Sequence, residues 1–109
     1  MAEPDEDIIA TLSRGFISDA AARLEAMDGA LGRLANPPPA PQCEDAKNLL
    51  RFESHRLRGS GASFGFPEIT RLAGQMEDYL EGSGSDVAVL GRLMGALRSA
   101  VTGDDDPKP

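Results

Sequence analysis

Apolar residues recur along the chain at the spacing of an α-helix, and no segment alternates apolar and polar residues as a half-buried β-strand does. Within residues 7–35, Ile9, Leu12 and Phe16 form one apolar stripe, and a second stripe follows it. The second stripe has the spacing i, i+4, i+7, i+11, i+14 and consists of Ala20, Leu24, Met27, Leu31 and Leu34. This pattern predicts one long helix, or a short helix that leads into a longer one.

A proline-rich segment separates this region from a second predicted helix. Residues 36–41 read NPPPAP, and we interpret them as a stiff connection between helices rather than as a ligand for a proline-recognition domain. The second helix is predicted over about 44–63. Gly65 ends this helix, and Pro67 suits the first turn of a third one.

A glycine- and serine-rich turn at 82–85 separates the third predicted helix from the last one. Ser85 or Asp86 can cap the last helix, which ends at Gly103. The predicted core positions of these two helices are Ile69, Leu72, Ala73, Met76, Leu80, Leu90, Leu93, Leu97 and Val101.

Short connections between amphipathic helices favour an all-α fold, an antiparallel up-down four-helix bundle, here with an additional short N-terminal helix. The length of 109 residues fits one domain. We expect a flexible acidic N-terminus over 1–6, the bundle over 7–103 and a disordered C-terminal tail over 104–109.

The charge and composition of the chain restrict its partners. A formal net charge of -7 argues against binding to a nucleic acid, whose phosphates require clustered Lys and Arg. No apolar run approaches membrane-spanning length, and the acidic first residues do not resemble a signal peptide, so we expect a cytoplasmic protein that does not bind a membrane. The single cysteine, Cys43, cannot form an internal disulfide and is interpreted as an incidental thiol.

The only histidine, His55, is predicted to face solvent. An angular projection of the 44–63 helix defines a core face made of Ala46, Leu49, Leu50, Leu57, Ser60 and Gly61. His55 lies about 180° from the centre of that face. It is therefore either an idle surface histidine or a reactive one, but not a core residue.

The residues one turn away from His55 favour a reactive role. Arg51 and Arg58 place positive charge beside the ring, which suits a phosphoryl group or an acidic partner. Phe52 puts an aromatic ring on a face that should be polar, and Gly59 costs about 1 kcal/mol of helix propensity relative to alanine. Together these residues predict a protein that approaches the backbone closely, and Asn48 and Ala62 lie one step further out on the same face.

Other kinds of chemistry find little support in the sequence. A zinc or iron centre needs several more His or Cys ligands than the chain offers. The segment GSGASFG has no following Lys and no preceding strand, so it is not a nucleotide-binding P-loop. We therefore expect no intrinsic cofactor and no ATP site.

The sequence from His55 to Gly65, HRLRGSGASFG, resembles the signature of histidine phosphotransfer (Hpt) domains, which lies on the second helix of a four-helix bundle. The likeness extends to Phe16-Ile17-Ser18-Asp19 in the first helix and to Ile69 and Leu72 in the third.

The resemblance implies a role for several residues of the motif. His55 would be the phosphorylated residue, and Arg58, in place of the usual lysine, would lie close to the phosphoryl group. Glu77, or failing it Gln75, would accept a hydrogen bond from the imidazole, although a plain surface role for Glu77 remains open. Glu53 departs from the family's usual alanine on the buried arc, so it needs a partner or a rotated helix.

The resemblance implies a phosphocarrier without independent turnover, which exchanges a phosphoryl group with response-regulator receiver domains and receives it through a hybrid or other sensor kinase. The receiver would supply Mg²⁺, and Asn48, Arg51, Phe52, Gly59 and Ala62 would form the docking face. A helical adaptor that binds receivers without using His55 is the first alternative. A kinase fragment or dimeric kinase core is the second, but a dimer should expose an apolar helix stripe and the sequence suggests none, so we expect a complete monomeric protein.

Overall fold

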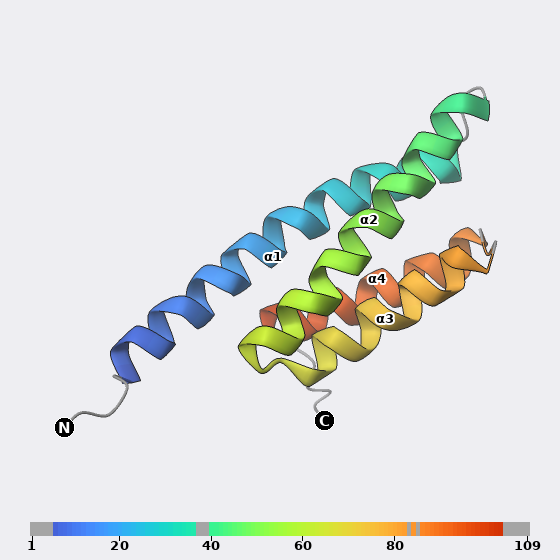
Figure 1. Ribbon diagram of the computed structural model, residues 1–109. Coiled ribbons are helices and arrows are strands. Elements are labelled where there is room, and N and C mark those ends of the chain that lie inside the picture. Colours follow the sequence, from blue (N-terminus) through green and yellow to red (C-terminus); the bar gives the residue numbers. More distant parts are fainter. Residues whose placement is uncertain (1–5, 37–39, 83, 85, 104–109) are drawn as a thin grey trace, which may run out of the picture.

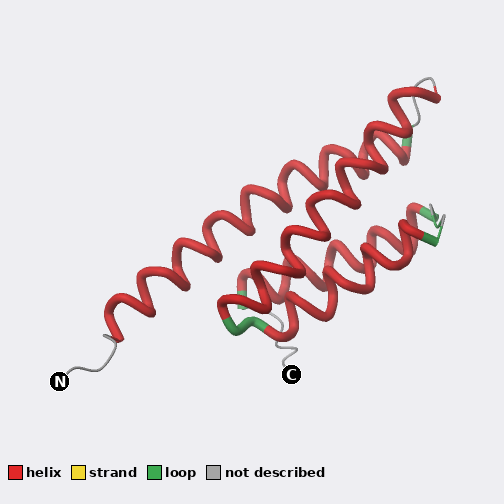
Figure 2. The backbone as a smooth tube through the Cα atoms, in the orientation of Figure 1, coloured by secondary structure: helices red, strands yellow, loops and turns green. Residues whose placement is uncertain are grey.

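The computed structural model describes residues 6–36, 40–82, 84 and 86–103, and these form four helices joined by short turns (Figures 1 and 2). The helices are α1 (Glu6–Ala35), α2 (Ala40–Phe64), α3 (Pro67–Glu81) and α4 (Val87–Thr102). The prediction of an all-α fold is confirmed.

The four helices form an antiparallel up-down bundle. Each helix packs against the next one along the chain, and α4 closes the ring by packing against α1. Among the described residues the diagonal pairs, α1 with α3 and α2 with α4, have no Cα atoms within 8 Å of each other. The helices therefore occupy the corners of a square around one core, as short connections between amphipathic helices predict.

The core contains most of the apolar positions that the sequence pattern predicts, but Leu12 is exposed and Leu31, Leu34 and Leu49 are only half-buried. Leu93 is only half-buried, and Met94 takes the core position beside it. The buried apolar side chains are Phe16, Ala20, Leu24, Met27, Ala30, Ala46, Leu50, Leu57, Ile69, Leu72, Ala73, Met76, Leu80, Leu90, Met94, Leu97 and Val101.

The prediction of an additional short N-terminal helix is wrong, because α1 is one continuous helix of 30 residues. No proline interrupts the sequence from Glu6 to Ala35, and the space beside Gly15 is open, so nothing ends the helix between the two stripes. The change from one stripe to the other reflects helical periodicity rather than a boundary.

The predicted start of α2 is four residues late. Pro41 occupies the first turn of α2, where a missing backbone N–H costs nothing, and the helix begins at Ala40. Residues 37–39 of the proline segment, Ser85 and most of the two predicted tails, 1–5 and 104–109, lie outside the described residues.

The turns that end α2 and begin α4 follow the predicted signals. Gly65 has a φ of 81°, a left-handed conformation that favours glycine, and Pro67 is the first residue of α3. Asp86 caps α4, because its side chain accepts a hydrogen bond from the backbone N–H of Ala88. Gly103 ends α4 with a φ of 75°.

The helices differ in length, and this leaves one end of α1 without a neighbour. The N-terminal turns of α1 extend beyond the end of the bundle (Figure 1). The side chains of Ile8 and Leu12 lie on this extension and are 59% and 54% exposed. The expectation that the chain exposes no apolar helix stripe is therefore wrong.

Candidate functional site

His55 lies near the middle of α2 and points out of the bundle, as predicted. Its side chain is 72% exposed, whereas Ser54 and Leu57, which face the core, are fully buried. The helix is anchored by its core side, so the ring is presented from a rigid support.

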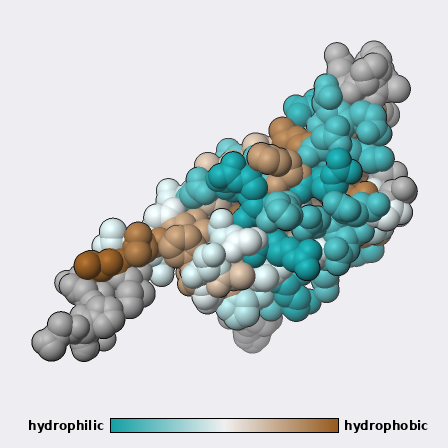
Figure 3. All heavy atoms as spheres, viewed as in Figure 1, coloured by the Kyte–Doolittle hydropathy of each residue, from teal (hydrophilic) through white to brown (hydrophobic). Residues whose placement is uncertain are grey.

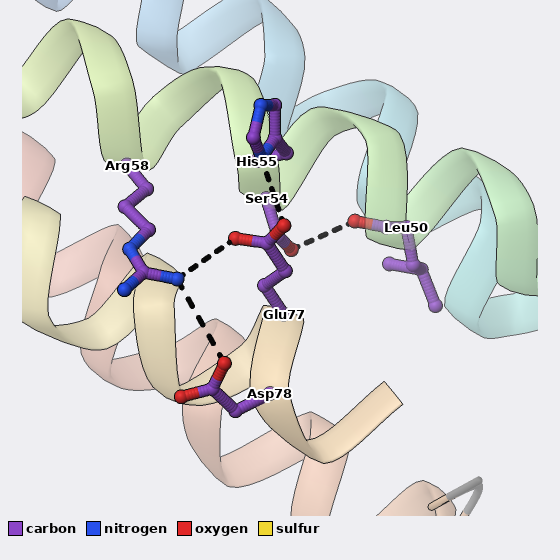
Figure 4. A network of polar contacts seen from close by, with 6 residues as sticks. All are labelled: Leu50, Ser54, His55, Arg58, Glu77 and Asp78. Atoms are coloured by element: carbon purple, nitrogen blue, oxygen red, sulfur yellow. Dashed lines mark hydrogen bonds and ion pairs between the residues drawn. The ribbon is translucent and has the colours of Figure 1, made fainter. Parts of the chain in front are cut away.

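One ring nitrogen of His55 is already engaged. Its Nδ1 lies 2.8 Å from Oε2 of Glu77 on α3 (Figure 4). Because an ionised carboxylate can only accept a hydrogen bond, Nδ1 carries the proton and donates a hydrogen bond to Glu77. The lone pair is then on Nε2, the ring nitrogen that points away from Glu77.

The pKa of Glu77 favours the ionised carboxylate. The largest single influence, burial, raises its pKa, but hydrogen bonds from His55 and Arg58 and the charges of both residues outweigh burial and hold the pKa below its usual range. Glu77 is thus an acceptor at neutral pH, which is the state that the tautomer of His55 requires.

Arg58 lies one turn after His55 and binds the second oxygen of the same carboxylate. Its Nη1 donates to Oε1 of Glu77 at 3.1 Å and lies 3.8 Å from Oδ1 of Asp78. The Arg58 side chain passes over Gly74 of α3, where a Cβ atom would lie 3.4 Å from its Nε, an ordinary van der Waals contact. The arginine was expected beside the phosphoryl position, and the structure places it on Glu77.

Glu77 rather than Gln75 faces the histidine. Gln75 is exposed on α3, whereas only 12% of the Glu77 side chain is exposed. Its predicted position at the flank of the helix underestimated its depth, since α2 covers it. The imidazole of His55 and the guanidinium of Arg58 thus meet at one buried carboxylate, that of Glu77.

Two polar contacts fix α2 below the histidine. The buried hydroxyl of Ser54 donates to the backbone carbonyl of Leu50 at 2.7 Å (Figure 4). Glu53, whose position on the buried arc required a partner, accepts from Nη1 of Arg23 on α1 at 2.7 Å. The helix need not rotate to satisfy Glu53, and the ion pair holds α1 and α2 together.

Gly59 and Gly61 differ in what surrounds them. A Cβ atom at Gly59 would meet nothing within 4 Å, so the bundle itself does not require glycine there. A Cβ atom at Gly61 would lie 2.5 Å from Oγ1 of Thr70 and 3.3 Å from the carbonyl of Phe66. Gly61 therefore allows α2 and α3 to pack closely, while Gly59 leaves bare backbone facing outward, beside His55.

The predicted docking residues share one exposed face of α2. Phe52 is 56% exposed, and the guanidinium of Arg56 lies over its ring, 5.5 Å from the centroid. Arg51 donates to the side-chain oxygen of Asn48 at 2.8 Å, and Ala62 is exposed one turn beyond Arg58. Three grooves border His55. The first is lined by Asn48, Arg51, Phe52, Glu77 and Glu81. Gly59 lines the other two, together with Arg56 in one and Ala62 in the other.

The comparison with protein families agrees with this geometry. The match to the Hpt domain covers residues 11–103, which is most of the chain. The chain belongs to the Hpt domain family. Hpt domains serve histidine phosphotransfer and interact with receiver domains and kinases in phosphorelays. Searches of curated proteins and of solved structures gave no match.

Several residues of this Hpt domain's site escaped the sequence reasoning. Asp78 and Gly74 surround Arg58, and Phe64 and Ser63 line a groove that begins at His55. Gly74 lies within an otherwise good helical pattern, and a glycine there could have signalled a close approach. The exposed Phe64 carried no such signal, because its exposure depends on how α3 and α1 pack.

Two negative findings bear on the described part of this Hpt domain. Within residues 6–36, 40–82, 84 and 86–103, no three His, Cys, Asp or Glu side chains are grouped so that they could hold a metal ion. No described helix is both long enough and apolar enough to cross a membrane.

Proposed function

We propose that this Hpt domain carries a phosphoryl group on Nε2 of His55, receiving it from the aspartyl phosphate of one receiver domain and giving it to the aspartate of another. It does so as a monomer in the cytoplasm, downstream of a hybrid or other sensor kinase. The observation that carries the proposal is the hydrogen bond between His55 Nδ1 and Glu77, 2.8 Å long, on an otherwise exposed ring.

The hydrogen bond prepares Nε2 for attack. With the proton on Nδ1, the Nε2 lone pair attacks phosphorus, the bond from phosphorus to the aspartate oxygen breaks, and aspartate leaves as a carboxylate. The imidazole gains positive charge as the new N–P bond forms. The Glu77 carboxylate stabilises that charge through the Nδ1 proton, and the reverse reaction uses the same contacts.

The receiver supplies the divalent metal ion that transfer requires. We propose that the receiver's acidic pocket holds the Mg²⁺ that neutralises the phosphoryl oxygens in transfer. On this side, Gly59 lets the pocket approach the backbone of α2, and Arg51 offers positive charge to the acidic rim. Asn48, Phe52 and Ala62 complete the docking face.

The decisive experiment measures acid-labile phosphate on the full chain. Wild type and His55→Gln are incubated with each of several phosphorylated receiver domains and Mg²⁺. We expect label on the wild type and none on His55→Gln, because glutamine has no nucleophilic ring nitrogen. Arg92→Gln, an exposed change on α4, which does not pack against α2, is the control and should still be labelled.

The same samples test the adaptor alternative. If receivers bind both proteins equally and none labels the wild type, the domain is a receiver-binding adaptor that does not use His55.

A further inference from the structure

The guanidinium of Arg58 is shared between two carboxylates of α3 that hold it in different ways (Figure 4). Its Nη1 donates a hydrogen bond to Oε1 of Glu77 at 3.1 Å and lies 3.8 Å from Oδ1 of Asp78. The Glu77 side chain is largely buried, whereas the Asp78 side chain is 76% exposed. The contact with Glu77 is therefore a buried hydrogen bond, and the contact with Asp78 is an ion pair open to solvent.

Asp78 has no part in the core of the bundle. Among the described residues, the structure pairs its side chain with Arg58 alone. Figure 3 shows a largely hydrophilic surface over α2 and α3, and the exposure of Arg58 and Asp78 lets water screen the pair. Neither packing nor the tautomer of His55, which depends on Glu77, accounts for a second carboxylate at Arg58.

A phosphoryl group on His55 would add a third acceptor for Arg58. Residues three apart on a helix are neighbours, so the Arg58 side chain can reach a group attached to Nε2 of His55. Such a group carries up to about two negative charges and has three acceptor oxygens, with which arginine forms charge-assisted hydrogen bonds. Nη1 of Arg58 points to α3, however, and Nε2 points away from Glu77 (Figure 4). The guanidinium must therefore leave Asp78 to bind the phosphoryl group.

We propose that Asp78 is a positioning residue that competes with a phosphoryl group on His55 for Arg58, and so shifts phosphoryl exchange toward the receiver. This inference rests on the function proposed above. In the exchange, the bond from Nε2 to phosphorus forms as the bond from phosphorus to the receiver's aspartate oxygen breaks, and no other covalent bond changes. Asp78 holds Arg58 only while the imidazole is unphosphorylated, so this contact favours the unphosphorylated form.

Glu77 does not offer the same control, because it also binds the Nδ1 proton that orients the ring of His55. Among the described residues, Asp78 is paired with Arg58 and not with the ring, so its removal alters the position of the arginine without altering the tautomer. Exposed ion pairs are weak, and the loss of this one should change the equilibrium constant of exchange about two- to fivefold.

The test measures the equilibrium constant of phosphoryl exchange between the full chain and one receiver that labels the wild type. The amounts of the phosphorylated and unphosphorylated forms of both proteins, taken before hydrolysis removes the label, give this constant. It compares the free proteins, so contacts within the complex do not affect it. We expect Asp78→Asn to shift the constant about two- to fivefold toward the phosphorylated Hpt domain.

Two controls isolate the role of Arg58. Asp45→Asn removes the same charge from an exposed position of α2, about 15 Å along the helix from His55, and should leave the constant unchanged. In an Arg58→Gln background, Asp78→Asn should have no effect, because the arginine through which Asp78 acts is gone. A shift that persists in that background would mean direct repulsion between Asp78 and the phosphoryl group, and it would overturn the inference.

A second measurement uses the wild type alone. In the ¹⁵N-labelled protein, the side-chain N–H signals of Arg58 should move when His55 becomes phosphorylated, because the guanidinium leaves Asp78 for phosphoryl oxygens. Unmoved Arg58 signals, or equal equilibrium constants for the wild type and Asp78→Asn, would contradict the inference and leave the phosphocarrier role intact. If no receiver labels His55, the proposed function fails, and this inference fails with it.

Discussion

At His55, one carboxylate sets the orientation and the tautomer of a ring that is otherwise open to solvent. Glu77 uses Oε2 for the imidazole and Oε1 for Arg58, so both of its oxygens are occupied. Arg58 in turn lies across Gly74 and close to Asp78, which limits where its guanidinium can go. The arginine therefore acts on the histidine through Glu77, and it is a positioning residue in the unphosphorylated protein.

Removal of Glu77 should slow transfer without weakening docking. Glu77→Ala leaves Nδ1 with no acceptor on α3, so the proton is no longer held there and Nε2 is free for less of the time. We expect a roughly 10- to 100-fold lower transfer rate at saturating receiver with KM unchanged, the range known for carboxylates that orient metal-bound histidines.

Two comparisons check this prediction. Gln75→Ala is the matched control, an exposed change two residues earlier on α3, and it should leave the rate unchanged. The ¹⁵N shifts of the His55 ring should also show a smaller share of the Nδ1-protonated tautomer in Glu77→Ala. A normal rate in that variant would show that Glu77 is only a surface partner of the ring.

At the scale of the element, α2 uses glycine for two opposite purposes. Gly61 faces α3, where a Cβ atom would lie 2.5 Å from the side-chain oxygen of Thr70 and 3.2–3.3 Å from backbone atoms of Thr70 and Phe66. Gly59 faces solvent with open space around it. The two positions are half a turn apart on one helix, so the same substitution should have opposite effects on stability.

Alanine at these two positions gives a matched pair. Gly59→Ala should raise the free energy of unfolding by about 0.5–1 kcal/mol, because alanine has the higher helix propensity and meets no neighbour. Gly61→Ala should lower it by roughly 1–3 kcal/mol, since α2 and α3 must move apart.

Urea unfolding measures both changes, and receiver binding separates their functional effects. Gly59→Ala should weaken receiver binding although the free protein becomes more stable. Full binding by this variant would mean that no partner approaches the backbone at Gly59.

At the scale of the whole molecule, unequal helix lengths give an elongated shape. The Cα atoms have a radius of gyration of 15.3 Å, and the extents of the molecule are 58 × 34 × 21 Å. A compact domain of this length has a radius of gyration of about 13 Å. The difference comes from α1 and α2, which extend past the shorter α3 and α4 (Figure 1).

Small-angle X-ray scattering tests the shape and the monomeric state together. A monomer should give a radius of gyration near 15 Å and the forward scattering of one chain at all concentrations. Forward scattering that doubles with concentration would contradict the monomer, and its loss in Ile8→Ser/Leu12→Ser would locate the contact on α1.

The parts of this molecule that depend on one helix at a time were predictable from the sequence. The stripes of α3 and α4, the cap at Asp86 and the outward direction of His55 follow from periodicity and local chemistry. The depth of Glu77 was not predictable, because it depends on how α2 covers α3. The exposure of Ile8 and Leu12 was not predictable either, because it depends on where the other helices end.

The openness of the His55 ring also limits how long this protein can keep a signal. With 72% of the side chain exposed and Nε2 directed away from Glu77, a phosphoryl group there would stand in bulk water. The bundle then offers no chamber that delays hydrolysis, so the lifetime of the phosphorylated form would follow the intrinsic chemistry of an N–P bond. Such a protein passes information on during brief encounters, and any memory in the pathway must reside in its partners.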